Sequence, residues 1–74
     1  MGTRVRGPAM TALQLRDALF TEWCAARAEA NLAYDAWCFQ PGEEAYVVYR
    51  AAEDRADAAE EALARASMDF ALVA

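Results

Sequence analysis

The segment Gln40-Pro41-Gly42 interrupts two long stretches of this 74-residue chain, residues 11–39 and 43–74, that hold neither proline nor glycine. Proline pushes the residue before it out of helical dihedral angles, and glycine tolerates a positive φ. A tight reversal of the chain is therefore expected at residues 40–42. Both flanking stretches are long enough to form helices that lie side by side.

Each flanking stretch carries an apolar stripe whose members recur mostly at intervals of three or four residues. The first stripe consists of Ala12, Leu19, Trp23, Ala26, Ala30, Ala33 and Trp37. The second consists of Ala45, Tyr49, Ala52, Ala56, Ala59, Leu63, Ala66 and Phe70. This spacing places each stripe on one face of an α-helix. The sequence therefore predicts an all-α antiparallel helical hairpin, and two such hairpins can dimerise into a four-helix bundle.

A capping motif marks the expected start of the first helix. Thr11 and Gln14 form a Thr-x-x-Gln capping box, so this helix should run over residues 12–39. Residues 1–10 precede the cap, and we expect them to be a flexible N-terminal extension. The hairpin is expected to occupy residues 11–74.

Two carboxylates mark the expected start of the second helix. Glu43 and Glu44 favour its first turn, because the positive end of the helix dipole attracts negative charge. The helix should run over residues 43–70, with the last residues fraying or packing back on the hairpin through Phe70 and Leu72.

The positions of the stripes predict which residues meet. Folding about the turn pairs residues whose numbers sum to about 82 or 83, so that large side chains face small ones over much of the contact. The expected contacts are Trp37 with Tyr46, Ala33 or Tyr34 with Tyr49, Ala30 with Ala52, Ala26 with Ala56, Trp23 with Ala59, and Leu19 with Leu63. In the same register Glu29 lies across from Arg55, and Arg27 lies between Glu53 and Glu60.

Charge and residue content narrow the function classes. A net charge of -5 would repel a phosphate backbone, so we expect no nucleic-acid partner. The chain has no histidine, and its sequence contains no metal-ligand cluster, glycine-rich phosphate loop or activated nucleophile. We expect neither an enzyme nor a bound cofactor or metal. The N-terminal residues include no apolar run typical of a signal peptide or anchor, so a cytoplasmic protein without membrane contact is expected.

Cys24 and Cys38 are too far apart to form a disulfide within one helix. Their separation along a continuous helix is about 21 Å, against the roughly 4.4 to 6.8 Å between Cα atoms that a disulfide spans. The simpler interpretation is two buried or half-buried thiols that act as small hydrophobic groups. The alternative uses their midpoint, Asn31: two antiparallel copies crossing there would bring Cys24 of one chain near Cys38 of the other.

The candidate interaction residues combine these positions with the aromatic ones. Aromatic side chains at helical spacing are typical of a core, but those near the turn could also anchor a partner. The candidate set is Phe20, Cys24, Asn31, Tyr34, Trp37, Cys38, Phe39 and Tyr46. A run of carboxylates in the second helix, at residues 53–61, is interpreted as a solvated outer face.

The first helix is apolar around more of its circumference than the second, and we therefore expect it to lie centrally in a homodimeric bundle. The predicted function is a small non-enzymatic interaction module, such as an adaptor, assembly factor or accessory subunit, which could also bind a larger protein. Two alternatives stay open. One is an acidic inhibitor or antitoxin-like protein that masks a basic surface, and the other is a carrier or precursor peptide modified in its tail, Met68 to Ala74.

In architecture the chain resembles the small secreted helical hairpins of the WXG type. Those proteins carry a Trp-x-Gly motif in the turn and a Tyr-x-x-x-Asp/Glu signal after the second helix. Here Trp37-Cys38-Phe39 lacks the glycine, and the match from Tyr49 to Glu53 lies inside the second helix. The resemblance covers the architecture alone.

Overall fold

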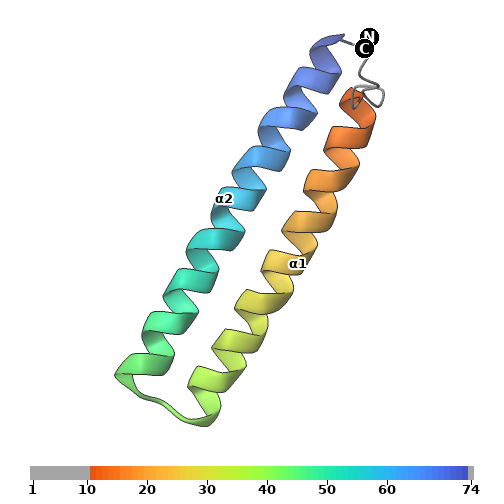
Figure 1. The fold of residues 1–74 in the computed structure, drawn as a ribbon. Helices are drawn as coiled ribbons and strands as arrows, with labels where there is room; N and C mark the ends of the chain where they lie inside the picture. The colour runs from red at the N-terminus through yellow and green to blue at the C-terminus, as the bar shows by residue number, and fades with distance from the viewer. Residues whose placement is uncertain (1–10, 74) are drawn as a thin grey trace, which may run out of the picture.

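The computed structural model describes residues 11–73, and it describes side chains for residues 11–68. It consists of two helices, α1 (Ala12–Phe39) and α2 (Glu43–Val73), which run antiparallel and side by side (Figure 1). The predicted all-α helical hairpin is confirmed. The start of α1 and the end of α2 lie at one end of the hairpin, and the turn lies at the other (Figure 1). The extension expected at residues 1–10 lies outside the described residues.

The start of α1 has the predicted capping box. The Gln14 backbone N–H donates to the Thr11 hydroxyl oxygen at 3.1 Å, and the Thr11 N–H donates to the Gln14 side-chain oxygen at 2.9 Å. Each side chain thus satisfies a backbone amide that the first helical turn leaves without a partner. At the start of α2, Glu43 and Glu44 lie in the first turn, and the Tyr46 N–H donates to the Gly42 carbonyl at 3.0 Å.

The turn lies at residues 40–42, as predicted. Glycine tolerates a positive φ, but the turn does not use this freedom, because no residue in the described part of the chain has one. Gln40, with φ -137° and ψ 83°, leaves the helical region instead, as the residue before a proline is biased to do. Its N–H still donates to the Ala36 carbonyl at 2.9 Å, which closes the last turn of α1. The three-residue connection therefore reverses the chain without a left-handed residue.

The end of α2 also differs from expectation, because the helix continues to Val73 rather than ending near residue 70. No glycine or proline follows Gly42, so the sequence offers no stop signal there. The expectation that Phe70 and Leu72 pack back on the hairpin concerns side chains outside the described ones.

The contact between the helices follows the two predicted stripes, which we call the seam. Its centre consists of three alanines, Ala30 and Ala56 at 0% exposure and Ala52 at 3%, with Ala26 and Ala33 packed against them. The other seam members within residues 19–66 are partly buried. Ala12, which we also placed in the seam, is exposed because it lies at the open end of the hairpin.

Contacts across the seam confirm the predicted register. The rings of Trp37 and Tyr46 have centroids 5.1 Å apart, and those of Tyr34 and Tyr49 are 5.4 Å apart. At the open end, Arg16 Nε donates to the Ser67 hydroxyl oxygen at 3.2 Å. All three pairs have residue numbers that sum to 83.

Two ion pairs flank the seam on opposite sides. Arg27 meets Glu53 at 2.6 Å, and Arg55 meets Glu29 at 3.7 Å. Both contacts were predicted from the register, whereas Glu60, the other carboxylate expected near Arg27, forms no ion pair in the described structure. Neither described helix contains a segment that is long and apolar enough to cross a membrane.

Candidate interaction faces

One broad side of the hairpin carries large apolar and thiol side chains, and we call it the aromatic–thiol face. It contains the α1 residues Leu13, Phe20, Cys24, Asn31, Tyr34 and Cys38. Each follows a seam-stripe position by one residue, so its side chain is rotated from the seam by about 100° around the helix. Phe20 is 51% exposed and Tyr34 46% exposed, and both thiols are exposed.

Aromatic rings gather at the turn end of this face. Trp37 stacks on Tyr49 with centroids 5.5 Å apart and an interplanar angle of 11°, and it also meets Tyr34 edge-on at 6.0 Å. Tyr46 completes the group, 5.1 Å from the Trp37 ring. Such ring pairs stabilise a structure beyond the area that they bury. This aromatic cluster, Tyr34, Trp37, Tyr46 and Tyr49, fixes the two helices where they meet the turn.

Polar contacts on the aromatic–thiol face are few. Hydrogen bonding to the Cys38 thiol, together with the negative charge that Cys38 can carry, raises the pKa of the Tyr34 hydroxyl above its ordinary value of 10.0. Arg27 and Glu53 lie where this face meets α2, with side chains 33% and 22% exposed, so their ion pair is partly shielded from water.

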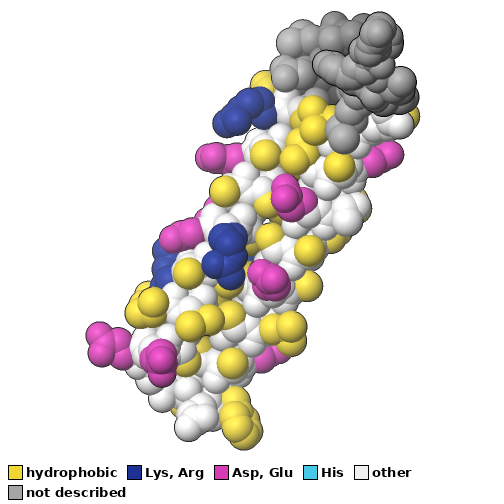
Figure 2. All heavy atoms as spheres, viewed as in Figure 1, with side chains coloured by type: hydrophobic (Ala, Val, Ile, Leu, Met, Phe, Trp, Pro, Cys, Tyr) yellow, Lys and Arg dark blue, Asp and Glu magenta, His cyan; other side chains and the backbone are white. Residues whose placement is uncertain are grey.

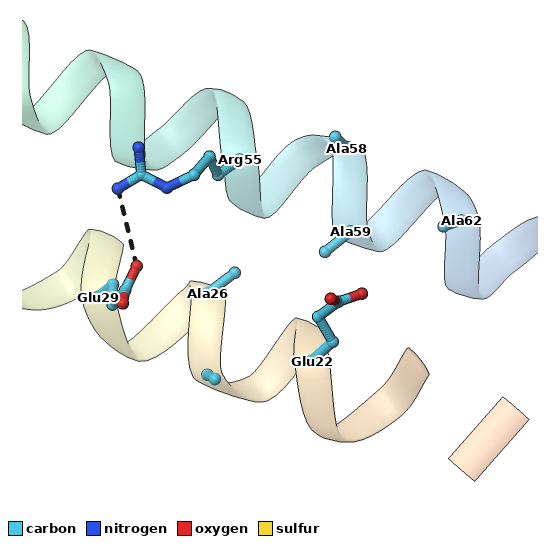
Figure 3. A pocket seen from close by; sticks show the side chains of 8 residues that line it. Glu22, Ala26, Glu29, Arg55, Ala58, Ala59 and Ala62 are labelled. Carbon is cyan, nitrogen blue, oxygen red and sulfur yellow. Dashed lines mark ion pairs between the residues drawn. The ribbon is translucent and has the colours of Figure 1, made fainter. Parts of the chain in front are cut away.

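The opposite broad side of the hairpin has a shallow groove lined mostly by alanine (Figure 3). Its volume is about 460 Å³, and its lining residues are Glu22, Ala25, Ala26, Glu29, Arg55, Ala58, Ala59 and Ala62. Glu22 and Glu29 come from α1, and Arg55 reaches across from α2 to Glu29 (Figure 3). We call this surface the alanine groove. Its floor offers methyl groups and its rim offers charges.

Figure 2 shows small apolar side chains spread over both helices, with acidic and basic groups among them. The alanine groove is shallow, whereas small-molecule sites are usually deep pockets with converging polar groups. Among the described residues no group of three or more His, Cys, Asp or Glu side chains could hold a metal ion.

The structure brings together only part of the predicted interaction set. Tyr34, Trp37, Cys38 and Tyr46 lie together at the turn end, and the rings of Phe20 and Trp23 are 5.8 Å apart farther along α1. Cys24 and Asn31 lie between these two groups on the same face of the helix. Phe39 is separate, because its position on α1 points away from the seam, and it is 90% exposed.

Two expectations about burial need correction. The thiols of Cys24 and Cys38 are exposed in the hairpin, not buried or half-buried, because α2 covers α1 along the seam only. We also expected the aromatic side chains at helical spacing to belong to the core. This is confirmed for Trp23, Trp37 and Tyr49, which are partly buried. Phe20, Tyr34, Phe39 and Tyr46 are exposed for the same reason as the thiols.

Three features of the structure were not predicted from the sequence. The alanine groove arises between two helices and could not be read from either stripe alone. The contact of Tyr34 with Cys38 was foreseeable, because residues four apart are neighbours on a helix. Trp23 was placed in the seam, but its Nε1 atom is buried with no hydrogen-bond partner among the described residues, and neither helical pattern signals this.

No protein family matches this chain, and no curated protein or solved structure does so either. These comparisons add no support to the resemblance to WXG-type hairpins, so the function has to be argued from the exposed faces.

Proposed function

We propose that this chain is a non-enzymatic protein–protein interaction module that acts as a homodimer, with α1 in the centre of a four-helix bundle. The observation that carries the proposal is that the buried side chains are small, whereas several large apolar side chains are exposed. Among the side chains that the structure describes, the buried ones are three alanines, whereas Leu13, Phe20 and Tyr34 lie about half exposed on one face of α1. Alanine contributes little buried area, so the hairpin alone gains little hydrophobic stabilisation.

A second copy would supply the missing burial. In a helical bundle the central helix is apolar on two faces, and α1 has both the seam and the aromatic–thiol face. On α2, the positions that flank the seam on the corresponding side are mostly charged or polar, including Arg50, Glu53 and Asp57. This asymmetry favours an arrangement with α1 inside and α2 outside.

Sedimentation equilibrium over a range of micromolar concentrations tests the proposal. A dimer is expected, with a melting temperature that rises with protein concentration, because association stabilises the folded state by mass action. A well-folded monomer whose melting temperature is independent of concentration would contradict it.

A specific observation supports one second candidate, an acidic protein that masks a basic surface. Asp57, Glu60 and Glu61 are exposed on α2, and with Ala64 they line a shallow depression of about 400 Å³. Binding through these carboxylates should weaken steeply as salt rises, because salt screens exposed charges, whereas an apolar dimer contact should be nearly insensitive. The salt dependence of binding to a basic protein therefore separates the two candidates. A role for the tail from Met68 to Ala74 concerns mostly side chains outside the described ones.

A further inference from the structure

We propose that the second copy docks on the aromatic–thiol face, where α1 crosses α1 of the partner subunit in antiparallel orientation at Asn31. This inference rests on the proposed homodimer and goes beyond it, because it names the face, the helix and the crossing point. Three observations carry it: a second heptad pattern on α1, the placement of Asn31 between two thiols, and the charges that the crossing brings together.

The first observation is that α1 has two heptad patterns displaced by one residue. The seam uses positions 12, 19, 23, 26, 30, 33 and 37. The second pattern, displaced by one residue, has apolar or thiol side chains at 13, 20, 24, 34 and 38 and polar ones at 17, 27 and 31. Alternating steps of four and three residues are the spacing by which helices pack in bundles. The displacement of one residue turns the second pattern by about 100° around the helix, so α1 can pack against α2 on one face and against a second copy on another.

The second observation is the place of Asn31 in that pattern. Cys24, Asn31 and Cys38 follow one another at intervals of seven residues, and all three are exposed in the isolated hairpin. An uncharged polar residue between two thiols at such a position can fix the register of paired helices, since an alternative register would leave it buried against apolar side chains. Across a two-fold axis Asn31 meets its own copy, and two amide side chains can each donate and accept.

The third observation is charge complementarity at this crossing. Antiparallel helices that cross at Asn31 place Arg27 level with Asp35 of the partner subunit, and the two-fold axis repeats this pair. Arg27 already pairs with Glu53 of its own chain. In the dimer it would serve carboxylates of both chains.

The surface available is sufficient for such an interface. A specific dimer buries about 800 Å² on each partner, roughly one seventh of the 5795 Å² that the chain exposes. The alanine groove is less suited to a second copy. Its lining is mostly alanine, so a partner docked there would bury little apolar area, and its carboxylates, Glu22 and Glu29, outnumber its cation, Arg55.

Chemical cross-linking with a short bifunctional maleimide tests the crossing point. Under the proposal, Cys24 lies near Cys38 of the partner subunit, while the two copies of Cys24 are about 21 Å apart. The wild-type protein should therefore form a covalent dimer whose linked peptides contain Cys24 and Cys38. Cys24→Ser and Cys38→Ser should each fail to cross-link alone, and a mixture of the two variants should form a linked heterodimer.

The alternative outcomes are distinguishable. If Cys38→Ser cross-links to itself through Cys24, the helices cross near residue 24 and the proposal is wrong. If sedimentation shows a dimer that does not cross-link, another face is used, so the proposed function stands while this inference fails. If the protein is a monomer throughout, both fail.

A pair of neighbouring substitutions gives an independent test that needs no cysteine. Asn31→Glu would set two carboxylates against each other at the two-fold axis, and the dimer dissociation constant should rise by about tenfold or more. Leu32→Glu is the matched control, because Leu32 is 69% exposed yet lies about 100° farther around α1, away from the proposed contact. A larger loss of dimer for Leu32→Glu than for Asn31→Glu would overturn the proposal.

Discussion

The two halves of the seam pack by different means. At the turn, Trp37 of α1 lies among three tyrosine rings, with centroids between 5.1 and 6.0 Å away. In the middle, Ala30, Ala52 and Ala56 meet with at most 3% exposure, so methyl groups alone fill the space between the helices. Large rings stabilise through area and ring geometry, whereas small side chains stabilise by allowing close approach. Substitutions that shrink a side chain should therefore be most destabilising at the turn end, and substitutions that enlarge one should be most destabilising in the middle of the seam.

The halves also differ in how they hold a tryptophan. Phe20 is the aromatic ring next to Trp23, and the register sets Trp23 against Ala59 of α2. Its buried Nε1 atom has no partner among the described residues. A buried donor without a partner costs about 1 to 3 kcal/mol. The part of the seam lined by alanines thus accommodates the Trp23 ring at a penalty that the aromatic cluster avoids.

The largest effect is expected from Trp37→Ala. This substitution removes the ring that contacts Tyr34, Tyr46 and Tyr49, and it should destabilise the fold by about 2 to 4 kcal/mol. Urea unfolding followed by far-UV circular dichroism, at one fixed protein concentration, measures the change. Phe39→Ala is the control, because Phe39 is 90% exposed and its loss should have little effect on the monomer fold. Equal losses in the two variants would mean that the aromatic cluster does not hold the turn end together.

The converse substitution enlarges a side chain in the middle of the seam, where the alanines pack. Ala56→Leu should destabilise the fold by about 1 to 3 kcal/mol, because Ala56 is fully buried where the helices approach closely. Ala51→Leu, on the exposed side of the same helix, should change stability by less than about 0.5 kcal/mol. The same denaturant titration compares them. A shift below about 0.5 kcal/mol for Ala56→Leu would mean that the close approach lies elsewhere.

The two tryptophans allow a sharper comparison. Trp23→Phe removes the unpartnered N–H along with part of the ring, so the two effects oppose each other and stability should change little or rise by up to about 1 kcal/mol. Trp37→Phe only removes ring area and should be destabilising by about 1 kcal/mol. If Trp23→Phe proves the more destabilising of the two in chemical denaturation, the Trp23 N–H has a partner in solution.

The sequence predicted the seam and its register because both follow from periodicity and from one turn. Trp37 meets Tyr46, and Arg27 meets Glu53, since a hairpin with a short connection leaves little freedom to slide. Exposure was harder to predict, because periodicity shows which residues share a face and not whether a neighbour covers that face. Phe20, Cys24 and Cys38 look like core residues in the sequence and are exposed in the single chain. The unpartnered Trp23 N–H depends on atomic positions that no residue pattern specifies.

The smallest effect concerns Gly42, which adjoins the aromatic half. Gly42 has no positive φ, and a Cβ atom built on it would have nothing within 4 Å, so a side chain there is expected to cause no strain. The Gly42 carbonyl accepts the first hydrogen bond of α2, from the Tyr46 N–H, so Gly42 occupies the N-cap position of that helix. A serine side chain caps a helix well at this position. Gly42→Ser should therefore stabilise the fold by roughly 0.5 kcal/mol, through the cap and through the smaller conformational entropy of the unfolded chain.

Gly42→Ala, which adds a Cβ without a hydroxyl, separates these contributions, because it retains the entropic gain and loses the cap. A loss of about 1 kcal/mol or more for both variants would show that the turn in solution uses a left-handed glycine. The backbone conformation at the turn would then have to be revised, while the aromatic contacts that fix the register would still require the same pairing of α1 with α2.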